Sequence, residues 1–379
     1  MRHSSGLSRK DSLVIKGVAL LAMMWHHCFL SGRFDGFMIS FLPLTQGQVE
    51  NIAAFSKICV SLFAFVSGYG LCASLQNLFQ EEEFSSKKVS KWVLTRYIKS
   101  FSGYWLIVVL AWIVTALIDM RPGKIYFTGS AYMGVFHMVT DLLGIGQLLG
   151  TPMLVGTWWY MSAAFVFIIT APLLYWMLRH FGGIVCLATL MIIPRIGGAA
   201  YPGTIDFYTF LPVFCIGMIF YRNDIFGRVS SWICRGKVHY TAAVLISVFA
   251  TAVCYKLSYH MGNGQFWDFK YDLFVAVYVV LIYLTAAKIA GLKQVLAFLG
   301  KHSANIFMIH TFVRDVYMRQ FIYSRGHFLA IIVTLLLISL LLSFALEVIK
   351  KLIHYEKFVN GLTGLASRQK AIGRKTNLG

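Results

Sequence analysis

Long apolar runs separated by short polar segments extend along the whole chain of 379 residues. A bilayer-spanning helix needs about 20 apolar residues, and ten runs come close enough to this length to be spans. We place them near residues 13–30, 52–74, 100–119, 157–178, 181–196, 206–221, 240–257, 272–290, 302–318 and 328–349. The run at 181–196 is short and ends at Pro194, so a helix there is expected to tilt, break or line a cavity. The pattern predicts an all-α, polytopic membrane bundle of about ten transmembrane helices.

Composition supports a membrane protein and argues against a soluble one. Hydrophobic residues make up 58% of the chain and charged residues 13%, whereas soluble domains carry about 25% charged residues. The formal net charge of +19 invites comparison with nucleic-acid-binding proteins. The basic residues, however, lie in short clusters between the apolar runs, which is the pattern that orients membrane proteins. We therefore expect the lipid bilayer, and no nucleic acid, among the partners.

The lysines and arginines also predict how the spans are oriented. An even number of spans puts both termini on one side of the membrane, which we take as cytoplasmic. Of the 34 lysines and arginines, 24 then fall in cytoplasmic segments and 9 in external ones, while Lys57 lies within a span. This asymmetry agrees with the positive-inside rule. Residues 1–350 are expected to form the transmembrane domain and residues 351–379 a basic cytoplasmic tail.

Two features argue against other classes of protein. The seven cysteines form no CxxC pair and six lie within apolar runs, so we expect neither a disulfide framework nor a metal site. The first apolar run follows Arg9 and Lys10, as in a signal peptide. However, Trp25-His26-His27 follows that run where a small-residue cleavage site would be needed. We therefore interpret this run as a retained first span.

The first span carries a lysine near one end and a histidine pair near the other. The eleven steps from Lys16 to His27 make three helical turns plus about 20°, which puts both residues on one face, about 16 Å apart. His26 lies about 80° off that face. A structural explanation is that Lys16 anchors the helix at the membrane edge and that His27 hydrogen-bonds a neighbouring helix. For Lys16 taken alone this explanation is favoured. For the aligned pair we favour function, because ionisable residues inside a membrane are rare without a role.

The chemistry of this pair suits a reaction with a phosphorylated donor. A neutral imidazole such as that of His27 is a suitable general base near neutral pH. A lysine reached from the cytoplasm, such as Lys16, suits a phosphate anchor. Together they suit a cytoplasmic donor whose reactive end enters the membrane.

Other polar and aromatic residues of the predicted spans are candidates for lining a site: Asp11, Ser67, Tyr69, Trp158, Trp159, Asn305, His310 and Arg314. Around Ser67, close helix packing is the favoured explanation, with Tyr69 as a hydrogen-bonding candidate. Trp158 and Trp159 fit an interfacial aromatic belt and a stacking surface for a sugar equally well.

The polar residues of the ninth run allow two explanations. Asn305 and His310 are about 140° apart on a helix, so they do not share a narrow face. Arg314 follows His310 by four residues and shares its side, which makes a polar column. A structural hydrogen-bond network explains these residues as well as a functional site does.

Four motifs, in order along the chain, resemble those of acyltransferase family 3, which comprises bacterial integral-membrane O-acyltransferases of surface polysaccharides. Lys16-x10-His27 resembles the basic residue and histidine of its first helix, and Phe65–Tyr69 its Ser-Gly-Tyr stretch. Trp158-Trp159-Tyr160 is similar to its aromatic motif. The late pattern of Gly-x-x-Ser and Ile-Tyr-Leu-Ile-His is matched around Gly300-Lys-His-Ser303 and Ile306-Phe-Met-Ile-His310.

This resemblance implies O-acyl transfer in the bacterial cytoplasmic (inner) membrane. The donor would be acetyl-CoA or another cytoplasmic acyl-CoA as co-substrate, with no permanently bound cofactor. The acceptor would be a hydroxyl of an exopolysaccharide, capsular or lipid-linked glycan, and polysaccharide-assembly proteins are expected partners. His27 takes the position of the family's essential histidine, with His26 beside it, and Lys16 that of the basic residue associated with the coenzyme.

The chain departs from the family pattern at two places. Lys16 stands where arginine is more common, which keeps the charge but loses bidentate phosphate geometry. Ser162-Ala163-Ala164 stands where many members carry a glutamate, so a carboxylate partner is not expected.

A different class of function remains open, namely a transporter or flippase of glycan intermediates that uses intramembrane histidines as proton relays. Its sequence cue would be an inverted repeat with paired broken helices, and the chain shows none. A glycan-binding accessory subunit is a third alternative. Acetyl and succinyl donors are not distinguished, and an acyl-enzyme on Ser67 or a cysteine stays open.

Overall fold

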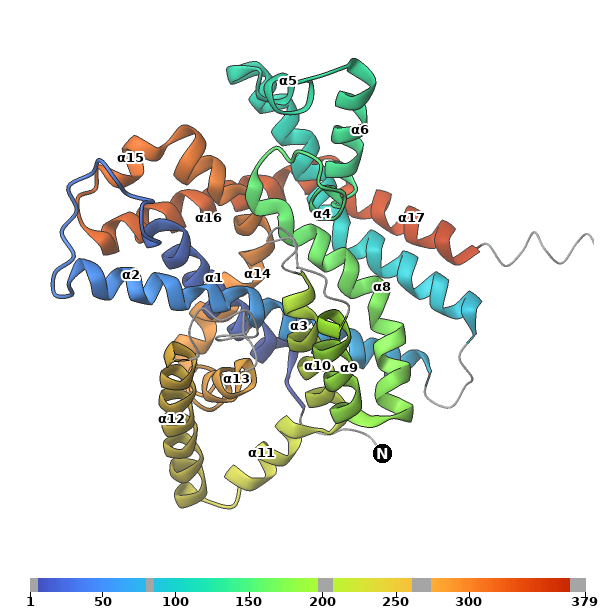
Figure 1. Cartoon of the computed structure of the whole chain (residues 1–379), viewed down its shortest axis with the longest axis vertical. Coiled ribbons are helices and arrows are strands. Elements are labelled where there is room, and N and C mark those ends of the chain that lie inside the picture. Colours follow the sequence, from blue (N-terminus) through green and yellow to red (C-terminus); the bar gives the residue numbers. More distant parts are fainter. Residues whose placement is uncertain (1–5, 80–84, 197–206, 261–273, 369–379) are drawn as a thin grey trace, which may run out of the picture.

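The computed structural model describes residues 6–79, 85–196, 207–260 and 274–368, which are helical almost throughout (Figure 1). Within those ranges no strand forms, and one isolated β-bridge joins Ser40 to His327. The elements are α1 (Arg9–Phe29), α2 (Gln46–Phe55), η1 (Ser56–Ile58), α3 (Cys59–Leu78), α4 (Ser86–Asp119), α5 (Arg121–Tyr126), α6 (Ala131–Leu142), α7 (Gly146–Leu149), η2 (Gly156–Trp158), α8 (Trp159–His180), α9 (Gly182–Ile196), α10 (Phe207–Arg222), α11 (Ile225–Ile233), α12 (Lys237–His260), α13 (Val275–Leu284), α14 (Ala290–Thr311), η3 (Phe312–Tyr317), α15 (Arg319–Tyr323), α16 (Phe328–Leu352) and α17 (Tyr355–Arg368). The predicted all-α class is confirmed.

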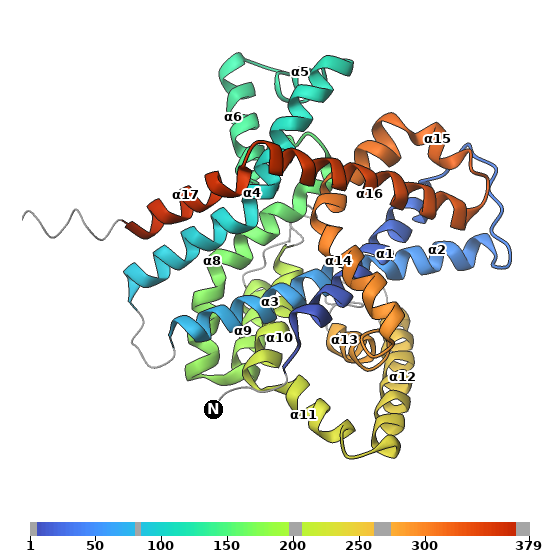
Figure 2. The same ribbon diagram turned by 180° about the vertical axis from the view of Figure 1, so that it is seen from behind.

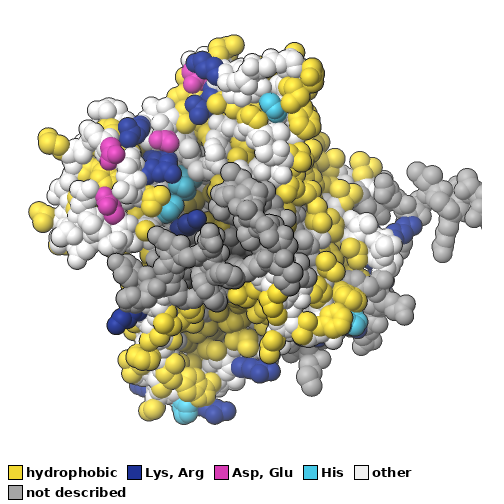
Figure 3. Space-filling view, in the orientation of Figure 1, with side chains coloured by type: hydrophobic (Ala, Val, Ile, Leu, Met, Phe, Trp, Pro, Cys, Tyr) yellow, Lys and Arg dark blue, Asp and Glu magenta, His cyan; other side chains and the backbone are white. Residues whose placement is uncertain are grey.

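Six helical stretches of the described chain are long and apolar enough to cross a membrane: Arg9–Phe29, Gln46–Leu78, Ser86–Asp119, Gly156–His180, Lys237–Leu257 and Phe328–Leu352. The pair Phe210–Arg222 and Ile225–Ile233 adds a seventh if its bend of 56° lies within one span. The surface agrees with a lipid environment, since Leu245 and Phe249 of α12 are exposed. Many apolar side chains also gather at the surface near α12 in Figure 3. The protein is a multi-pass helical membrane protein.

The six stretches coincide with six of the ten predicted spans, and helices also form at the other four. Of these four, α9 and α13 contribute only short apolar helices, and α10 leads into the bent pair. The span predicted at 302–318 differs most in its bounds. Its helix, α14, already begins at Ala290, and after Thr311 it gives way to the π-helical turn η3. The count of ten and the side of the termini stay predictions.

Helices α1 and α14 pack at backbone distance. A Cβ atom added to Gly17 would lie 2.1 Å from the carbonyl oxygen of Leu296, and one added to Gly300 would lie 1.9 Å from that of Leu13. Any larger side chain at either position would push the helices apart. Small residues of this kind allow transmembrane helices to approach closely, because lipid offers no hydrophobic force to bring them together.

The same two helices run parallel and in register. Near their N-termini, Nζ of Lys293 lies 2.6 Å from Oδ1 of Asp11. Near their C-termini, the ring centroids of His27 and His310 lie 4.9 Å apart. These pairs are 282 and 283 positions apart in the sequence, and the glycine pair between them is also 283 apart. A constant offset requires two helices that point in the same direction.

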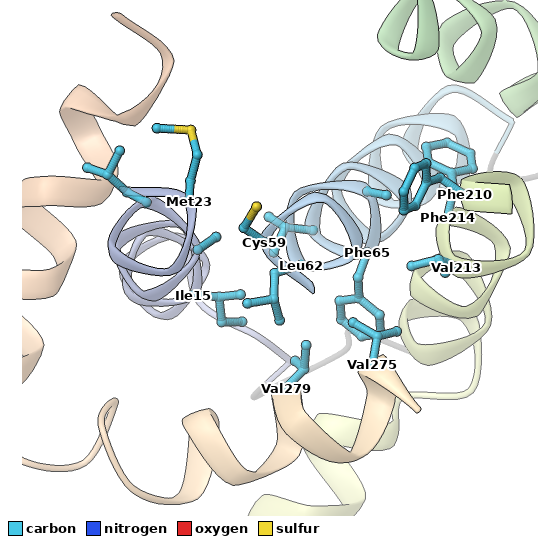
Figure 4. Packing of buried hydrophobic residues seen from close by; sticks show 14 of the residues in the cluster. Ile15, Met23, Cys59, Leu62, Phe65, Phe210, Val213, Phe214, Val275 and Val279 are labelled. Atoms are coloured by element: carbon cyan, nitrogen blue, oxygen red, sulfur yellow. The ribbon is translucent and has the colours of Figure 1, made fainter. Parts of the chain in front are cut away.

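Helices α3 and α10 form a second contact of this kind. A Cβ atom added to Gly68 would lie 2.0 Å from the carbonyl oxygen of Phe214, and one added to Gly217 would lie 2.1 Å from that of Phe65. Figure 4 shows the apolar side chains packed around α3, among them Ile15, Met23, Cys59, Leu62, Phe65, Phe210, Val213, Phe214, Val275 and Val279. The core therefore joins α1, α3, α10 and α13.

A buried aspartate ties the segment between α4 and α8 to the bundle. Asp141 of α6 is 1% exposed and accepts hydrogen bonds from the phenols of Tyr104 (2.8 Å) and Tyr126 and from the backbone N–H of Leu154 (2.8 Å). Burial raises the pKa of the Asp141 carboxyl, while these hydrogen bonds oppose the rise. The contact with Leu154 holds the chain just before η2, the turn that leads into α8.

The predicted basic tail is helical over the part that the structure describes. Helix α17 lies alongside α4 in both views (Figures 1 and 2), and the phenol of Tyr355 donates a hydrogen bond of 2.8 Å to the carbonyl oxygen of Ser102. Its predicted cytoplasmic location is not tested by this contact.

The glycine contact between α1 and α14 leads to a stability prediction. Gly300→Ala should melt at a lower temperature in detergent, because its Cβ would meet the carbonyl oxygen of Leu13. Overpacking of this kind costs about 1–3 kcal/mol or more. Gly291→Ala, in the first turn of α14, is the matched control, since nothing lies within 4 Å of a Cβ there. Equal melting temperatures for the two variants would contradict the proposed packing.

Candidate active site

A cavity of about 300 Å³ lies among α1, α3, α4, α8 and α14. Most of its wall is apolar, with methionine and phenylalanine side chains such as Met23 and Phe307. Its polar lining comprises Lys16, His27, Ser67, Ser100, Thr157, Trp159, Tyr160 and Ser303. No aspartate or glutamate of the described chain lines it. The cavity therefore offers a cation, an imidazole and several hydroxyls between mostly apolar walls.

Lys16 and His27 reach this cavity from the same helix, as their eleven-residue spacing predicts. Helix α1 begins at a capping box, in which Ser8 and Asp11 bond each other's backbone and side chains. Within the described chain, no carboxylate lies within 4 Å of the Lys16 amine. Its charge is thus available to an anionic ligand.

His27 lies between two other histidines and has a free nitrogen. Its ring centroid is 5.2 Å from that of His26 and 4.9 Å from that of His310. Nδ1 of His27 is buried and meets no hydrogen-bond partner in the described part of the chain. Nδ1 of His26, by contrast, lies 2.8 Å from the carbonyl oxygen of Ala53, so it donates its proton there. His27 lines the cavity, whereas His26 does not line it and is held by α2.

Arg314 brings a permanent charge close to this cluster without lining the cavity. Its side chain is 1% exposed, and Nη2 donates a hydrogen bond of 3.2 Å to Asp315. Nε and Nη1 have no partner among the described residues. The residue lies on the π-helical turn η3, a distortion that is frequent at functional sites.

Aromatic and hydroxyl groups form another part of the cavity wall. Trp159 and Tyr160 line it from the start of α8, and Ser67 lines it from α3. An aromatic surface beside hydroxyl groups is suited to a sugar, because rings can stack on the apolar faces of the sugar while the hydroxyls pair with its own.

Two of the predicted site residues are used to hold helices instead. The phenol of Tyr69 accepts a hydrogen bond of 2.8 Å from the backbone N–H of Leu7, which fixes the chain before α1. The indole of Trp158 is 1% exposed and donates a hydrogen bond of 3.0 Å to the carbonyl oxygen of Met308. Neither residue lines the cavity. Asp11 likewise lies outside it, in the contact with α14 described above.

Asn305 faces α16 rather than the cavity. Its amide nitrogen donates hydrogen bonds to Oγ of Ser343 (3.1 Å) and to Glu347 (2.8 Å), and its oxygen accepts one from Lys350 (3.2 Å). All its polar atoms are thus paired within the helix bundle. The predicted angle of about 140° between Asn305 and His310 agrees with this division of α14 into two polar faces.

Several cavity residues were not singled out from the sequence as site candidates. Thr157 and Tyr160 belong to the same aromatic run as Trp159, and Ser303 belongs to the Gly-x-x-Ser motif. Their motifs could therefore have identified these residues as site candidates. Hydroxyl residues alone could not, because they are common in membrane spans. Ser100 of α4 lay outside every motif.

The fold defines a helical membrane bundle, and a lysine and a histidine line one of its cavities. A family model described as an acyltransferase domain matches residues 13–348 of the chain. The protein belongs to acyltransferase family 3 and is a membrane acyltransferase. No curated protein and no solved structure matches the chain.

The position of Asn305 leads to a prediction that separates stability from catalysis. Asn305→Leu should lower the thermal stability by about 0.5–1.5 kcal/mol, because it removes the hydrogen bonds to Ser343 and Glu347 while these two residues keep their contacts with His302 and Lys350. Acyl transfer by the folded protein should stay within about twofold of the wild type, a change that corresponds to less than about 0.5 kcal/mol. Asn360→Leu on α17, where the side chain is exposed, is the control. A loss of transfer without a loss of stability would place Asn305 in the active site.

Proposed function

We propose that the protein transfers an acyl group, in the first instance acetyl, from cytoplasmic acyl-CoA to a hydroxyl of an exopolysaccharide, capsular or lipid-linked glycan. The observation that carries the proposal is that Lys16 and His27 line one cavity in a chain of this acyltransferase family. The protein would act in the bacterial cytoplasmic membrane, alongside polysaccharide-assembly proteins.

Lys16 is proposed to bind a phosphate of the coenzyme. Its amine has no carboxylate within 4 Å among the described residues, and a lysine binds phosphate as a point charge. It lies about three helical turns from His27 on the same face. The pantetheine arm would extend along this face and bring the thioester to the histidine.

His27 is proposed to act as the general base. It would take the proton of the acceptor hydroxyl while the hydroxyl oxygen attacks the carbonyl carbon of the thioester. The C–S bond then breaks, and the thiolate of the coenzyme receives the proton from the His27 imidazolium. The products are the acylated acceptor and the coenzyme thiol, so the reaction needs no metal, oxidant or acyl-enzyme to balance.

The predicted topology fits this path between two compartments. In a chain with ten spans, the first and ninth spans cross the membrane in the same direction, and α1 and α14 do run parallel. With cytoplasmic termini, Lys16 would lie in the cytoplasmic half of α1 and His27 towards the outside. The donor would then enter from within, and Trp159 and Tyr160 would receive the sugar from the other side.

The role of His27 is tested by substitution. His27→Ala should reduce acylation by at least about 100-fold, since a positioned base contributes roughly 10²–10⁴-fold. The assay is transfer of labelled acetyl from acetyl-CoA by purified protein in lipid nanodiscs with isolated cell-envelope glycan. His239→Ala on α12, which packs on Trp232 away from the cavity, is the matched control. Retained transfer in His27→Ala would overturn the mechanism, and glycan movement without acetyl-CoA turnover would favour a transporter.

The role of Lys16 predicts a different kinetic signature. Lys16→Met should raise KM for acetyl-CoA about 10- to 100-fold, because a hydrogen bond to a charged group contributes about 1.5–3 kcal/mol. The KM for the acceptor should stay unchanged. Lys16→Arg keeps the charge and should restore most of the affinity for the donor. An effect confined to kcat in Lys16→Met would argue against coenzyme binding at this residue.

A further inference from the structure

A second polar chain leads from the cavity into the protein, beside His27. Thr157 lines the cavity from η2, and its Oγ1 lies 2.9 Å from Oγ1 of Thr311. Oγ1 of Thr311 lies 3.4 Å from Nε2 of His310. Thr311 is 6% exposed and His310 is 0% exposed. Two hydroxyls therefore connect the cavity wall to a buried imidazole.

His310 determines the direction of each hydrogen bond in this chain. Its Nδ1 lies 2.8 Å from the carbonyl oxygen of Phe307 and 3.2 Å from that of Ile306. Carbonyl oxygens only accept hydrogen bonds, so Nδ1 carries the proton and Nε2 of the neutral ring carries a lone pair. No carboxylate lies within 4 Å of the ring in the described chain, and a fully buried imidazole without one is neutral.

The two hydroxyls follow from this tautomer. The hydroxyl of Thr311 must donate to Nε2 of His310, since that nitrogen can only accept. Each hydroxyl has one proton, so the contact between the two threonines is a hydrogen bond donated by Thr157 to Thr311. Thr157 therefore presents only oxygen lone pairs to the cavity, and a ligand group that pairs with it must be a donor.

The attacking hydroxyl of the acceptor cannot be this donor. Under the proposed function its single proton goes to His27, so Thr157 must accept from another group. Both binding points adjoin the same imidazole: the ring of His310 is 4.9 Å from that of His27, and it is joined to Thr157 through Thr311.

The geometry points to a subsite at Thr157 for a second hydroxyl of the acceptor, next to the hydroxyl that is acylated. His310 and Thr311 are positioning residues, because they orient the Thr157 hydroxyl without touching the acceptor. The inference rests on the proposed function and narrows its acceptor to molecules with neighbouring hydroxyls, such as the ring diols of sugars.

Two alcohols of the same ring size test the subsite. Purified protein in nanodiscs is given labelled acetyl-CoA with either trans-cyclohexane-1,2-diol or cyclohexanol, and kcat/KM is measured for each. The wild type should prefer the diol by about tenfold, the effect of one good hydrogen bond, which exceeds the statistical factor of two for two hydroxyls. Thr157→Val should reduce the preference to that factor, and Thr157→Ser should retain it.

Thr311→Val distinguishes the orientation of Thr157 from a change in the shape of the cavity. Thr311 does not line the cavity, yet its loss removes the orientation of Thr157 and should also weaken the preference for the diol. Thr170→Val on α8, whose hydroxyl bonds its own helix at Val166, is the matched control and should keep the full preference.

The outcomes separate this inference from the proposed function. An equal preference for the diol in the wild type, Thr157→Val and Thr311→Val would overturn the subsite. Release of coenzyme thiol with no acylated product from either alcohol would also overturn it, while leaving His27-dependent cleavage of the thioester intact. Absence of any acetyl-CoA turnover with alcohols and with isolated cell-envelope glycan would overturn the proposed function itself.

Discussion

The backbone contact between α1 and α14 is the constraint on which the site depends. Gly17 and Gly300 leave no room for a side chain between the helices, so the two axes are held together at a depth where lipid supplies no hydrophobic force. Because the helices are parallel, each adds about 15 Å over the ten residues that follow its glycine. His27 and His310 consequently arrive at the same level. The imidazoles of His27 and His310 are therefore close together because Gly17 and Gly300 allow the two helices to approach.

Some polar side chains of the bundle have hydrogen-bond partners on neighbouring segments, and others have none among the described residues. Asn305, Trp158 and Tyr69 find partners on neighbouring helices or on the chain before α1. His27 keeps an unpartnered nitrogen among the described residues. The same residue lines the cavity together with Lys16. The cavity is therefore a candidate site because of the side chains that line it as well as its volume.

The sequence was a good guide where the signal is local. Helix periodicity alone put Lys16 and His27 on one face, and both line the cavity. The apolar runs predicted helices at all ten places, because hydrophobicity over about 20 residues is a property of a segment. The motifs also led to the family that matches residues 13–348. The sequence was a poorer guide to helix lengths, since α14 extends from Ala290 and ends in a π-helical turn.

By itself, the sequence determined the class of protein, its helices and the alignment of one lysine with one histidine, because these depend on composition and on a fixed rotation per residue. Tertiary structure decided which polar groups meet. The two polar faces of α14 send Asn305 towards α16 and Thr311 towards Thr157, a residue of a distant segment. Helix-to-helix contacts depend on rotation and depth in the bundle, and backbone approaches at single glycines set both. No local sequence pattern predicts these rotations and depths, and they bring side chains from separate helices together into a site.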